Sequence, residues 1–141
     1  MKALLVAAAL LLAGCAAPPR DPYAGRAPAG TQTQTLVVPR QQFAHPTFGA
    51  PSPVHARVTW NSSQRIDAWI TGDFEHDCAG YGLRTFHPAA AMLNSTGGVL
   101  EADLPAGTDC LILDNADFAG GQAPAGPDAT VSFTIDVWVR G

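Results

Sequence analysis

The chain has 141 residues and a formal net charge of −4, and 14% of its residues are charged. This length suits one globular domain and is too short for two of ordinary size. Lys2 is the single lysine, and the seven arginines are scattered one at a time. Because nucleic-acid binding needs clustered basic residues to neutralise phosphates, the composition argues against a nucleic-acid partner.

Residues 1–14 predict a secretory signal peptide. The positively charged start, Met1-Lys2, precedes an apolar run of eleven residues, Ala3–Ala13. That run has the length of a signal-peptide core and is too short to span a bilayer, which takes about 20 residues.

The apolar run ends in Leu12-Ala13-Gly14-Cys15, which resembles the lipobox of bacterial lipoproteins. The resemblance implies cleavage after Gly14 and attachment of a diacylglycerol to the Cys15 thiol, so that acyl chains anchor the mature protein in the cell envelope. Ala16 stands where an Asp would imply retention at the inner membrane, which favours the outer membrane, with the domain on its periplasmic or surface side. The alternative is an ordinary secretory signal with an accidental cysteine.

Residues 15–34 are rich in Pro, Ala and Gly, and Tyr23 is their only large apolar residue. Such a composition has little to bury and predicts a flexible tether. We therefore divide the chain into a signal peptide (1–14), a tether (15–34) and a folded domain (35–141).

Two cysteines remain once Cys15 carries lipid. Cys78 and Cys110 lie in no CxxC motif and have no metal-ligand spacing. In an oxidising compartment an even pair predicts a disulfide. The alternative is two free buried thiols.

Six short segments with alternating or continuous apolar residues predict β-strands, separated by Gly, Pro, Asn and Asp. They are Thr35–Pro39, Val54–Trp60, Arg65–Thr71, Gly98–Leu104, Thr108–Asp114 and Thr130–Val139. The second and third, joined by Asn61–Gln64, are expected to form a hairpin. The segment His87–Leu93 could form one or two helical turns, since Pro88 suits a first helical position. The pattern predicts an all-β fold, an antiparallel β-sandwich of immunoglobulin-like or jelly-roll-like type.

The chain from Gly98 onward resembles the C-terminal half of GOLD-type and prepeptidase-C-type sandwich domains. The resemblance rests on a strand, the turn Leu104-Pro105-Ala106-Gly107, a strand from Cys110 that ends in Asp114-Asn115, and a long final strand. It implies a binding or accessory module with no catalytic residues to carry over.

Two acidic segments are candidate sites for a divalent cation, through oxygen and nitrogen ligands. The first holds Asp73, Glu75, His76 and Asp77, and the second holds Asp114, Asn115, Asp117 and Asp128. The second has no EF-hand spacing. The alternatives are a solvated loop for the first segment and capping of a strand end by side-chain hydrogen bonds for the second.

No catalytic motif is present. The histidines at 45, 55, 76 and 87 form neither HxH nor HExxH, and Ser62-Ser63 has no Gly-x-Ser-x-Gly elbow. The sequence therefore predicts no enzyme and no cofactor.

Trp69 and Trp138 each lie on the polar face of a predicted strand, beside Asp67 and Asp136. If both strands belong to one sheet, they form a candidate binding surface for a glycan or an envelope protein. The alternative is that both cover a second small core beneath residues 72–97.

We therefore expect a lipid-anchored envelope lipoprotein with a non-catalytic binding or structural domain. The alternative is an envelope enzyme or divalent-metal-binding module with a site assembled from Asp, Glu and His loops. A buried, convergent cluster of such side chains would favour the alternative.

Overall fold

Antiparallel strands make up most of the computed structural model, which describes residues 20–79, 87–117 and 121–141. Over these residues the strands are β1 (Gly30–Val38), β2 (Phe43–Ala44), β3 (Thr47–Ala50), β4 (Val54–Thr71), β5 (Ala90–Leu104), β6 (Gly107–Asp114) and β7 (Ala129–Val139). One π-helical turn, Phe74–Cys78, follows β4. No helix in this part of the chain is long and apolar enough to cross a membrane.

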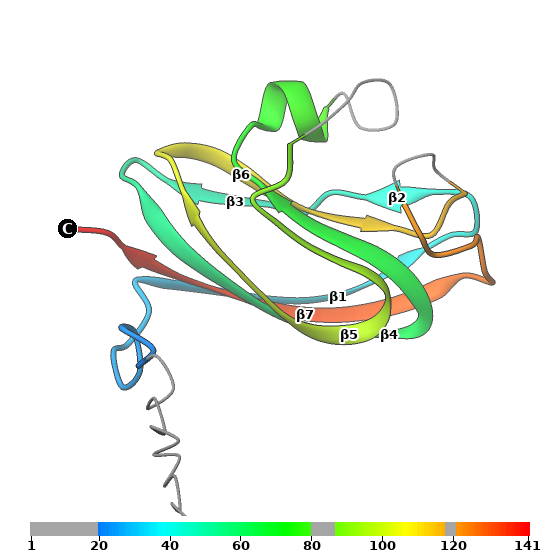
Figure 1. Cartoon of the computed structure of the whole chain (residues 1–141), viewed down its shortest axis with the longest axis horizontal. Coiled ribbons are helices and arrows are strands. Elements are labelled where there is room, and N and C mark those ends of the chain that lie inside the picture. The colour runs from blue at the N-terminus through cyan, green and yellow to red at the C-terminus, as the bar shows by residue number, and fades with distance from the viewer. Residues whose placement is uncertain (1–19, 80–86, 118–120) are drawn as a thin grey trace, which may run out of the picture.

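The strands form two layers, as Figure 1 shows. Layer one contains β1, β7, the first half of β4 and the second half of β5. Layer two contains the second half of β4, the first half of β5, and β6 with the short strands β2 and β3 beside it. Every strand pair is antiparallel, so the predicted antiparallel β-sandwich is confirmed.

Strands β4 and β5 bend together from one layer into the other (Figure 1). The β4–β5 register shifts between Asn61 and Ile66, and on β5 Gly97 and Gly98 have φ of 150° and 156°. A Cβ on Gly97 would lie 2.6 Å from the Trp60 carbonyl oxygen, so only glycine fits this close approach.

The predicted hairpin around Asn61–Gln64 is therefore wrong. The two halves of β4 do not pair with each other. On one side of β4, its first half pairs with β7 and its second half with β6. On the other side, both halves pair with β5. Polar turn formers mark a change of chain direction, but they do not distinguish a hairpin from a corner between layers.

The predicted helical turns at His87–Leu93 are also absent, because β5 already begins at Ala90. Ala90 pairs with Ile70 and Met92 with Ala68. Helix propensity is a weak preference, and the hydrogen-bonding edge of β4 overrides it.

Strand β1 begins at Gly30, inside the predicted tether. Its threonines alternate with glutamines and bond across to β7: Thr33 to Thr134 at 3.1 Å and Thr35 to Ser132 at 2.8 Å between hydroxyl oxygens. Residues 30–34 therefore belong to the domain, because cross-strand hydroxyl pairs stabilise a polar strand whose composition resembles a linker.

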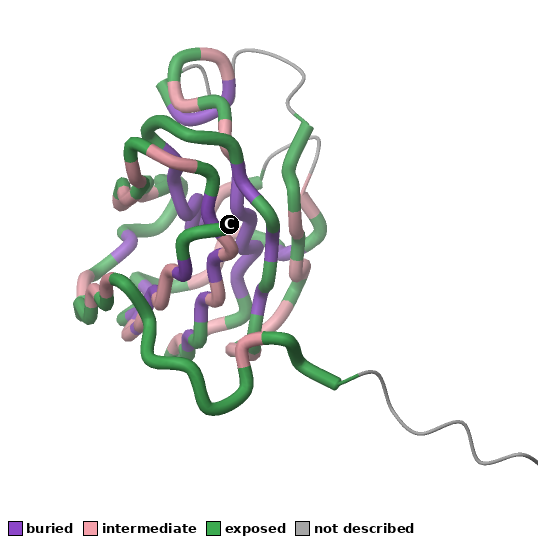
Figure 2. The backbone as a smooth tube through the Cα atoms, turned by 90° about the vertical axis from the view of Figure 1, so that its left-hand side faces the viewer, coloured by how far each residue is buried: buried purple, intermediate pink, exposed green. Residues whose placement is uncertain are grey.

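The core lies between the layers, where Figure 2 shows the buried stretches of the strands facing inward. The alternation predicted for three strands is confirmed by their buried residues: Val54, Ala56, Val58, Trp60, Leu100, Ala102, Leu104, Val131, Phe133 and Ile135. The continuous apolar run predicted in Thr108–Asp114 is buried on both faces, at Cys110, Leu111, Ile112 and Leu113. Toward the end of β7 the prediction fails, since Val137 is only partly buried and Val139 is 46% exposed.

Candidate functional site

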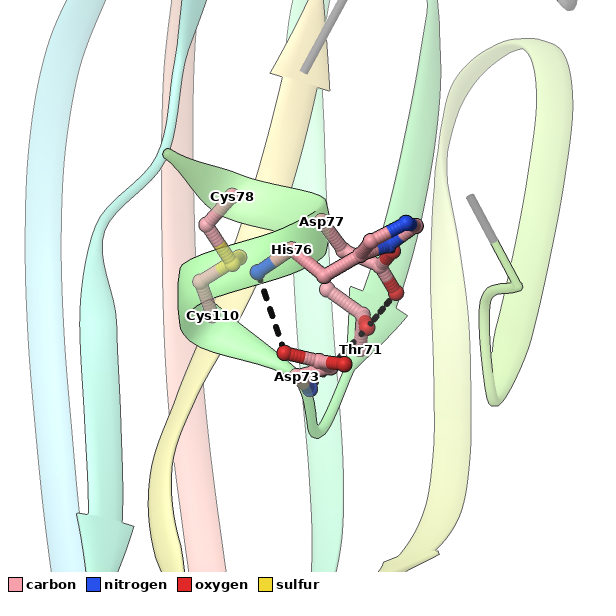
Figure 3. Close-up of a disulfide and its surroundings, with 6 residues drawn as sticks. All are labelled: Thr71, Asp73, His76, Asp77, Cys78 and Cys110. Carbon is pink, nitrogen blue, oxygen red and sulfur yellow. Dashed lines mark hydrogen bonds and ion pairs between the residues drawn. A yellow bond between two sulfur atoms is a disulfide. The ribbon is translucent and has the colours of Figure 1, made fainter. Parts of the chain in front are cut away.

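A disulfide between Cys78 and Cys110 fixes the π-helical turn onto the outer face of layer two (Figure 3). Cys110 lies on β6, which is hydrogen-bonded on both sides, and the two Cα atoms are 6.4 Å apart. The predicted disulfide is confirmed, and it joins the turn to the middle of a sheet.

The π-helical turn and its disulfide cover a second, smaller core, made of Trp69, Cys78, Cys110 and Ile112. Phe74 and Leu93 pack against this core. Trp69 is 2% exposed and Cys78 is 1% exposed. The neighbours of Cys78 in sequence, Asp77 and Gly80, predict a more exposed site for it than for Cys110. This prediction is wrong, because both cysteines are buried. Asp77 is buried as well, and its carboxylate bonds within the fold.

In the acidic segment 73–77, two carboxylates form hydrogen bonds within the segment and with Thr71 (Figure 3). Asp73 accepts a hydrogen bond from the His76 amide at 3.0 Å, which caps the turn. The buried carboxylate of Asp77 accepts one from the Thr71 hydroxyl at 2.5 Å, and its other oxygen lies 2.6 Å from His76 Nδ1. These bonds engage both oxygens of Asp77 and one oxygen of Asp73, among the oxygens that the sequence offers as cation ligands.

An open cleft of about 410 Å³ lies beside this turn. It brings together side chains from three parts of the chain: Thr71, Gly72, Asp73, His76, Asp77, His87, Ala89, Asp103, Leu104 and Pro105. Among all described residues, however, no three His, Cys, Asp or Glu side chains are grouped so that they could hold a metal ion.

Asp109 lies behind the cleft and was not singled out from the sequence. It is fully buried, and neither carboxylate oxygen has a hydrogen-bond partner among the described residues. A Cβ on Gly72 would lie 3.4 Å from one of these oxygens. Burial raises the pKa of Asp109 from 3.8 to about 6.

The second acidic segment holds the end of layer two together. Asn115 donates to the carbonyls of Val38 and Pro127, at 3.2 and 2.7 Å, and accepts from the Gly126 amide. The three aspartates here accept backbone amides: Asp114 from Ala116, Asp117 from Ala125 and Asp128 from Arg40. This geometry matches the strand-end capping alternative.

Another buried carboxylate, that of Asp67, joins three segments. It accepts the amides of Asn94 at 2.7 Å, Gln122 at 2.7 Å and Ala123 at 3.0 and 3.1 Å. The face of β4 that carries Asp67, Trp69 and Thr71 is therefore buried, although its alternation predicts a polar, solvent-facing side.

The two candidate tryptophans lie in different layers and form no common surface. Trp69 belongs to the second core under the π-helical turn, as one alternative predicts, but Trp138 does not. Trp138 is 5% exposed because residues 21–26 cover it, and its Nε1 donates to the Arg26 carbonyl at 3.0 Å.

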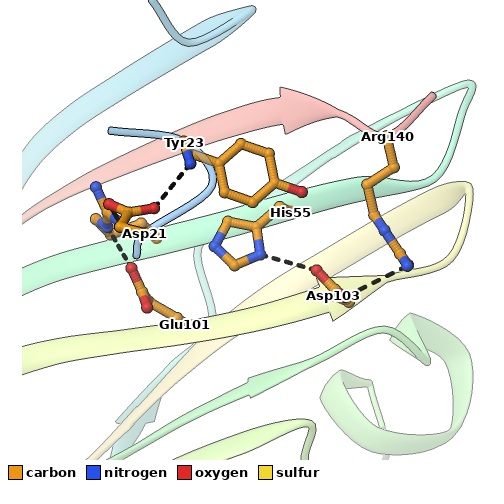
Figure 4. Close-up of polar contacts among 7 residues, drawn as sticks. Asp21, Tyr23, His55, Glu101, Asp103 and Arg140 are labelled. Carbon is orange, nitrogen blue, oxygen red and sulfur yellow. Dashed lines mark hydrogen bonds and ion pairs between the residues drawn. The ribbon is translucent and has the colours of Figure 1, made fainter. Parts of the chain in front are cut away.

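The covering segment docks on layer one through stacked rings and charges (Figure 4). The Tyr23 ring lies 4.2 Å from the His55 ring and 5.4 Å from that of Trp138, between centroids. His55 Nδ1 lies 2.8 Å from Asp103, whose other oxygen is 3.4 Å from Arg140.

Arg57 completes the docking site from the middle of layer one. Its guanidinium lies 5.3 Å from the Trp138 ring centroid and bonds both Glu101 and, at 2.5 Å, Asp21. The Tyr23 amide and then Arg57 lower the pKa of Asp21, and the two carboxylates raise that of Arg57. The segment expected to be a plain linker thus contributes an ordered polar contact.

The remaining candidates lie apart. His45 stands near the rings of Phe43 and Phe74, and the hydroxyls of Ser62 and Ser63 accept the amides of Gln64 and Thr130. Cys15 lies outside the described residues.

No protein-family model matches this chain, and no curated protein matches it in sequence. The geometry of the chain itself is therefore the basis for its functional assignment.

Proposed function

We propose that the protein is a lipid-anchored lipoprotein of the bacterial cell envelope whose sandwich is a non-catalytic binding or structural module. The signal-peptide pattern and Cys15 in its lipobox-like sequence support the anchor. The Cys78–Cys110 disulfide supports an oxidising compartment such as the envelope.

The docked segment 21–26 is the observation that carries this proposal. Its contacts with His55, Arg57 and Trp138 fix where the N-terminal part of the chain leaves the domain. From Cys15 to Arg20 the chain then reaches at most about 18 Å, since an extended residue spans about 3.3–3.6 Å. An anchor at Cys15 would hold the Trp138 end of layer one close to the membrane surface, at a fixed side of the domain.

The bonds made by two of the buried carboxylates support a non-catalytic role. Asp67 and Asp77 accept hydrogen bonds from amides, a hydroxyl and an imidazole within the fold. Buried carboxylates used in this way hold segments together. An envelope protein or a glycan is the class of ligand that such a surface-displayed module would take.

Detergent partitioning of the wild-type chain and a Cys15→Ser variant tests the anchor. The proposal predicts that the wild type enters the detergent phase and that the variant stays in the aqueous phase, because a hydroxyl cannot form the thioether. Cys15→Ala is the matched control and should behave like Cys15→Ser. A variant that still enters the detergent phase would contradict the proposal.

The alternative of an envelope enzyme or divalent-metal-binding module rests on the cleft beside the π-helical turn, with His76, His87 and Asp103 on its walls. Calorimetric titration of the full chain with Zn²⁺ and Ca²⁺ tests the metal case. Stoichiometric binding that His87→Ala abolishes would favour this alternative; our proposal predicts no such binding.

A further inference from the structure

Strand β1 forms an open edge of layer one. Among the described residues β7 is the only strand that pairs with it. An edge strand directs alternate N–H and C=O groups away from its sheet, where another strand can pair with them. Natural edges are commonly blocked by charges, prolines or bulges, and the nine residues Gly30–Val38 contain no charged residue and no proline. This edge is therefore available for strand addition.

The sequence of this edge is symmetric. Thr31-Gln32-Thr33-Gln34-Thr35 reads the same in both directions. When two such strands pair antiparallel about a two-fold axis at Thr33, each Thr31 faces a Thr35 and each Gln32 faces a Gln34. Over these five positions threonine meets threonine and glutamine meets glutamine, with no charged residue. The two-fold axis repeats each of these contacts, as in any isologous interface.

On its outer, solvent-facing side, β1 already forms hydroxyl hydrogen bonds with β7, and a second copy of β1 would lengthen this row. Thr33 and Thr35 bond to hydroxyls of β7, at 3.1 Å to Thr134 and 2.8 Å to Ser132. A second β1 in the same register would add another row of threonines to this ladder. Thr–Thr pairs across strands are favourable.

The inner face offers a complementary feature. A crevice of about 220 Å³ opens between β1 and β3, lined by Gly30, Thr31, Gln32, Phe48, Gly49, Ile135 and Val137. Gly30 has no side chain to fill its mouth. Leu36 shares this inner face of β1, where it packs against the core of its own copy and stays partly exposed. In the Thr33-centred register, Leu36 of the second copy lies opposite Gly30, so each copy places one leucine at the crevice of the other.

We propose that the β1 edge is a self-association site at which two copies of this chain pair antiparallel about Thr33 to form one continuous sheet. The inference does not depend on the lipid anchor or on the role of the domain. A second copy fits this edge better than an unrelated strand because the symmetric register satisfies both faces of β1 at once.

Site-directed disulfide trapping of the full chain tests the register. In the proposed pair the Thr33 Cβ atoms lie about 4.5–5.5 Å apart, within reach of a disulfide after small adjustment. Thr33→Cys should give a covalent dimer under mild oxidation, and so should a mixture of Thr31→Cys with Thr35→Cys. Thr31→Cys alone should cross-link poorly. Thr47→Cys, on the edge of layer two, is the matched control and should remain monomeric.

Charged substitutions of Thr33, which lies at the proposed two-fold axis, provide a second test. Thr33→Lys and Thr33→Glu, each alone, should weaken self-association at least roughly tenfold, since the axis places the like charges opposite each other. Mixing the two variants should restore the dimer. Circular dichroism should show that both variants keep the fold, because residue 33 faces solvent.

A monomeric wild-type chain, a dimer that Thr33→Lys leaves intact, or cross-linking through Thr47→Cys in place of Thr33→Cys would each overturn the proposal. Trapping of Thr33→Cys on a different envelope protein, with no self-dimer, would also overturn it and would assign the edge to a different partner.

Discussion

The ring of Tyr23 stacks on the imidazole of His55, with centroids 4.2 Å apart and planes 12° from parallel. Tyr23 belongs to a Pro-, Ala- and Gly-rich segment, whereas His55 belongs to β4 in the middle of layer one. The contact converts part of an apparent linker into a docked segment, which limits how far the domain can move from an anchor at Cys15.

The docked segment should be released by removal of this ring. Tyr23→Ala loses the stacking on His55 and the contact with Trp138, so we expect trypsin to cut after Arg26 on the order of tenfold faster. Tyr23→Phe is the matched control, because it keeps the ring and should be cut at the wild-type rate. Equal rates for Tyr23→Ala and the wild type would show that the stack does not hold the segment.

The disulfide should stabilise the sandwich substantially. A bridge with a sequence separation of 32 residues contributes about 3–4 kcal/mol by the chain-entropy argument. Because both cysteines are buried in the second core, Cys78→Ala and Cys110→Ala should each cost about 2–5 kcal/mol. Denaturant midpoints with and without reductant measure this. If reduction leaves the denaturant midpoint unchanged, the disulfide does not stabilise the fold as predicted.

Asp109 should make stability depend on pH. Because its pKa is raised to about 6, the folded protein binds this proton more tightly than the unfolded chain does. The free energy of unfolding therefore decreases as the pH rises from about 4 to about 6. Above pH 6 the ionised Asp109 destabilises the fold by about 2–3 kcal/mol relative to low pH.

The variant Asp109→Asn should therefore be more stable than the wild type at pH 7 and no more stable at pH 4. Chemical denaturation at both values measures the difference. Asp103→Asn is a control, since that carboxylate is 52% exposed and should not show the same pH-dependent gain. Equal stability of Asp109→Asn and the wild type at pH 7 would mean that the carboxylate is not effectively buried.

Asp67 should be one of the most sensitive polar positions in the domain. Asp67→Ala would leave the amides of Asn94, Gln122 and Ala123 without their acceptor, so we expect a loss of about 3–5 kcal/mol. Asp67→Asn keeps one acceptor oxygen and should lose less. A loss below about 1 kcal/mol for Asp67→Ala would show that other acceptors replace the carboxylate.

The layered strands could be predicted from the sequence because alternation reports which side chains face a core. Val54, Ala56 and Val58 are fully buried, as their spacing predicts. The disulfide followed from the number of cysteines and the expected compartment.

The corner in β4 and the start of β5 could not be predicted in the same way. Both depend on which distant strand offers hydrogen-bonding groups, and local propensity does not carry that information. The pairing of Ala90 with Ile70 is one such long-range effect.

The buried polar positions were missed for a related reason. Asp67 looks like an ordinary solvent-facing residue of an alternating strand until the segments that cover it are known, and Asp109 stands at the start of an apolar strand. One signal was present: Asp109 shares its strand face with Leu111 and Leu113, which places it toward the core. Nothing in residues 21–26 except the lone aromatic Tyr23 indicated that they would dock.

The intact mass of the full chain purified from the envelope fraction tests the central claim most directly. The account predicts the mass of residues 15–141 plus a diacylglycerol, with or without an N-acyl chain, less two hydrogens for the Cys78–Cys110 bond. A chain of unmodified mass, cleaved elsewhere or carrying a free thiol at Cys15, would contradict it.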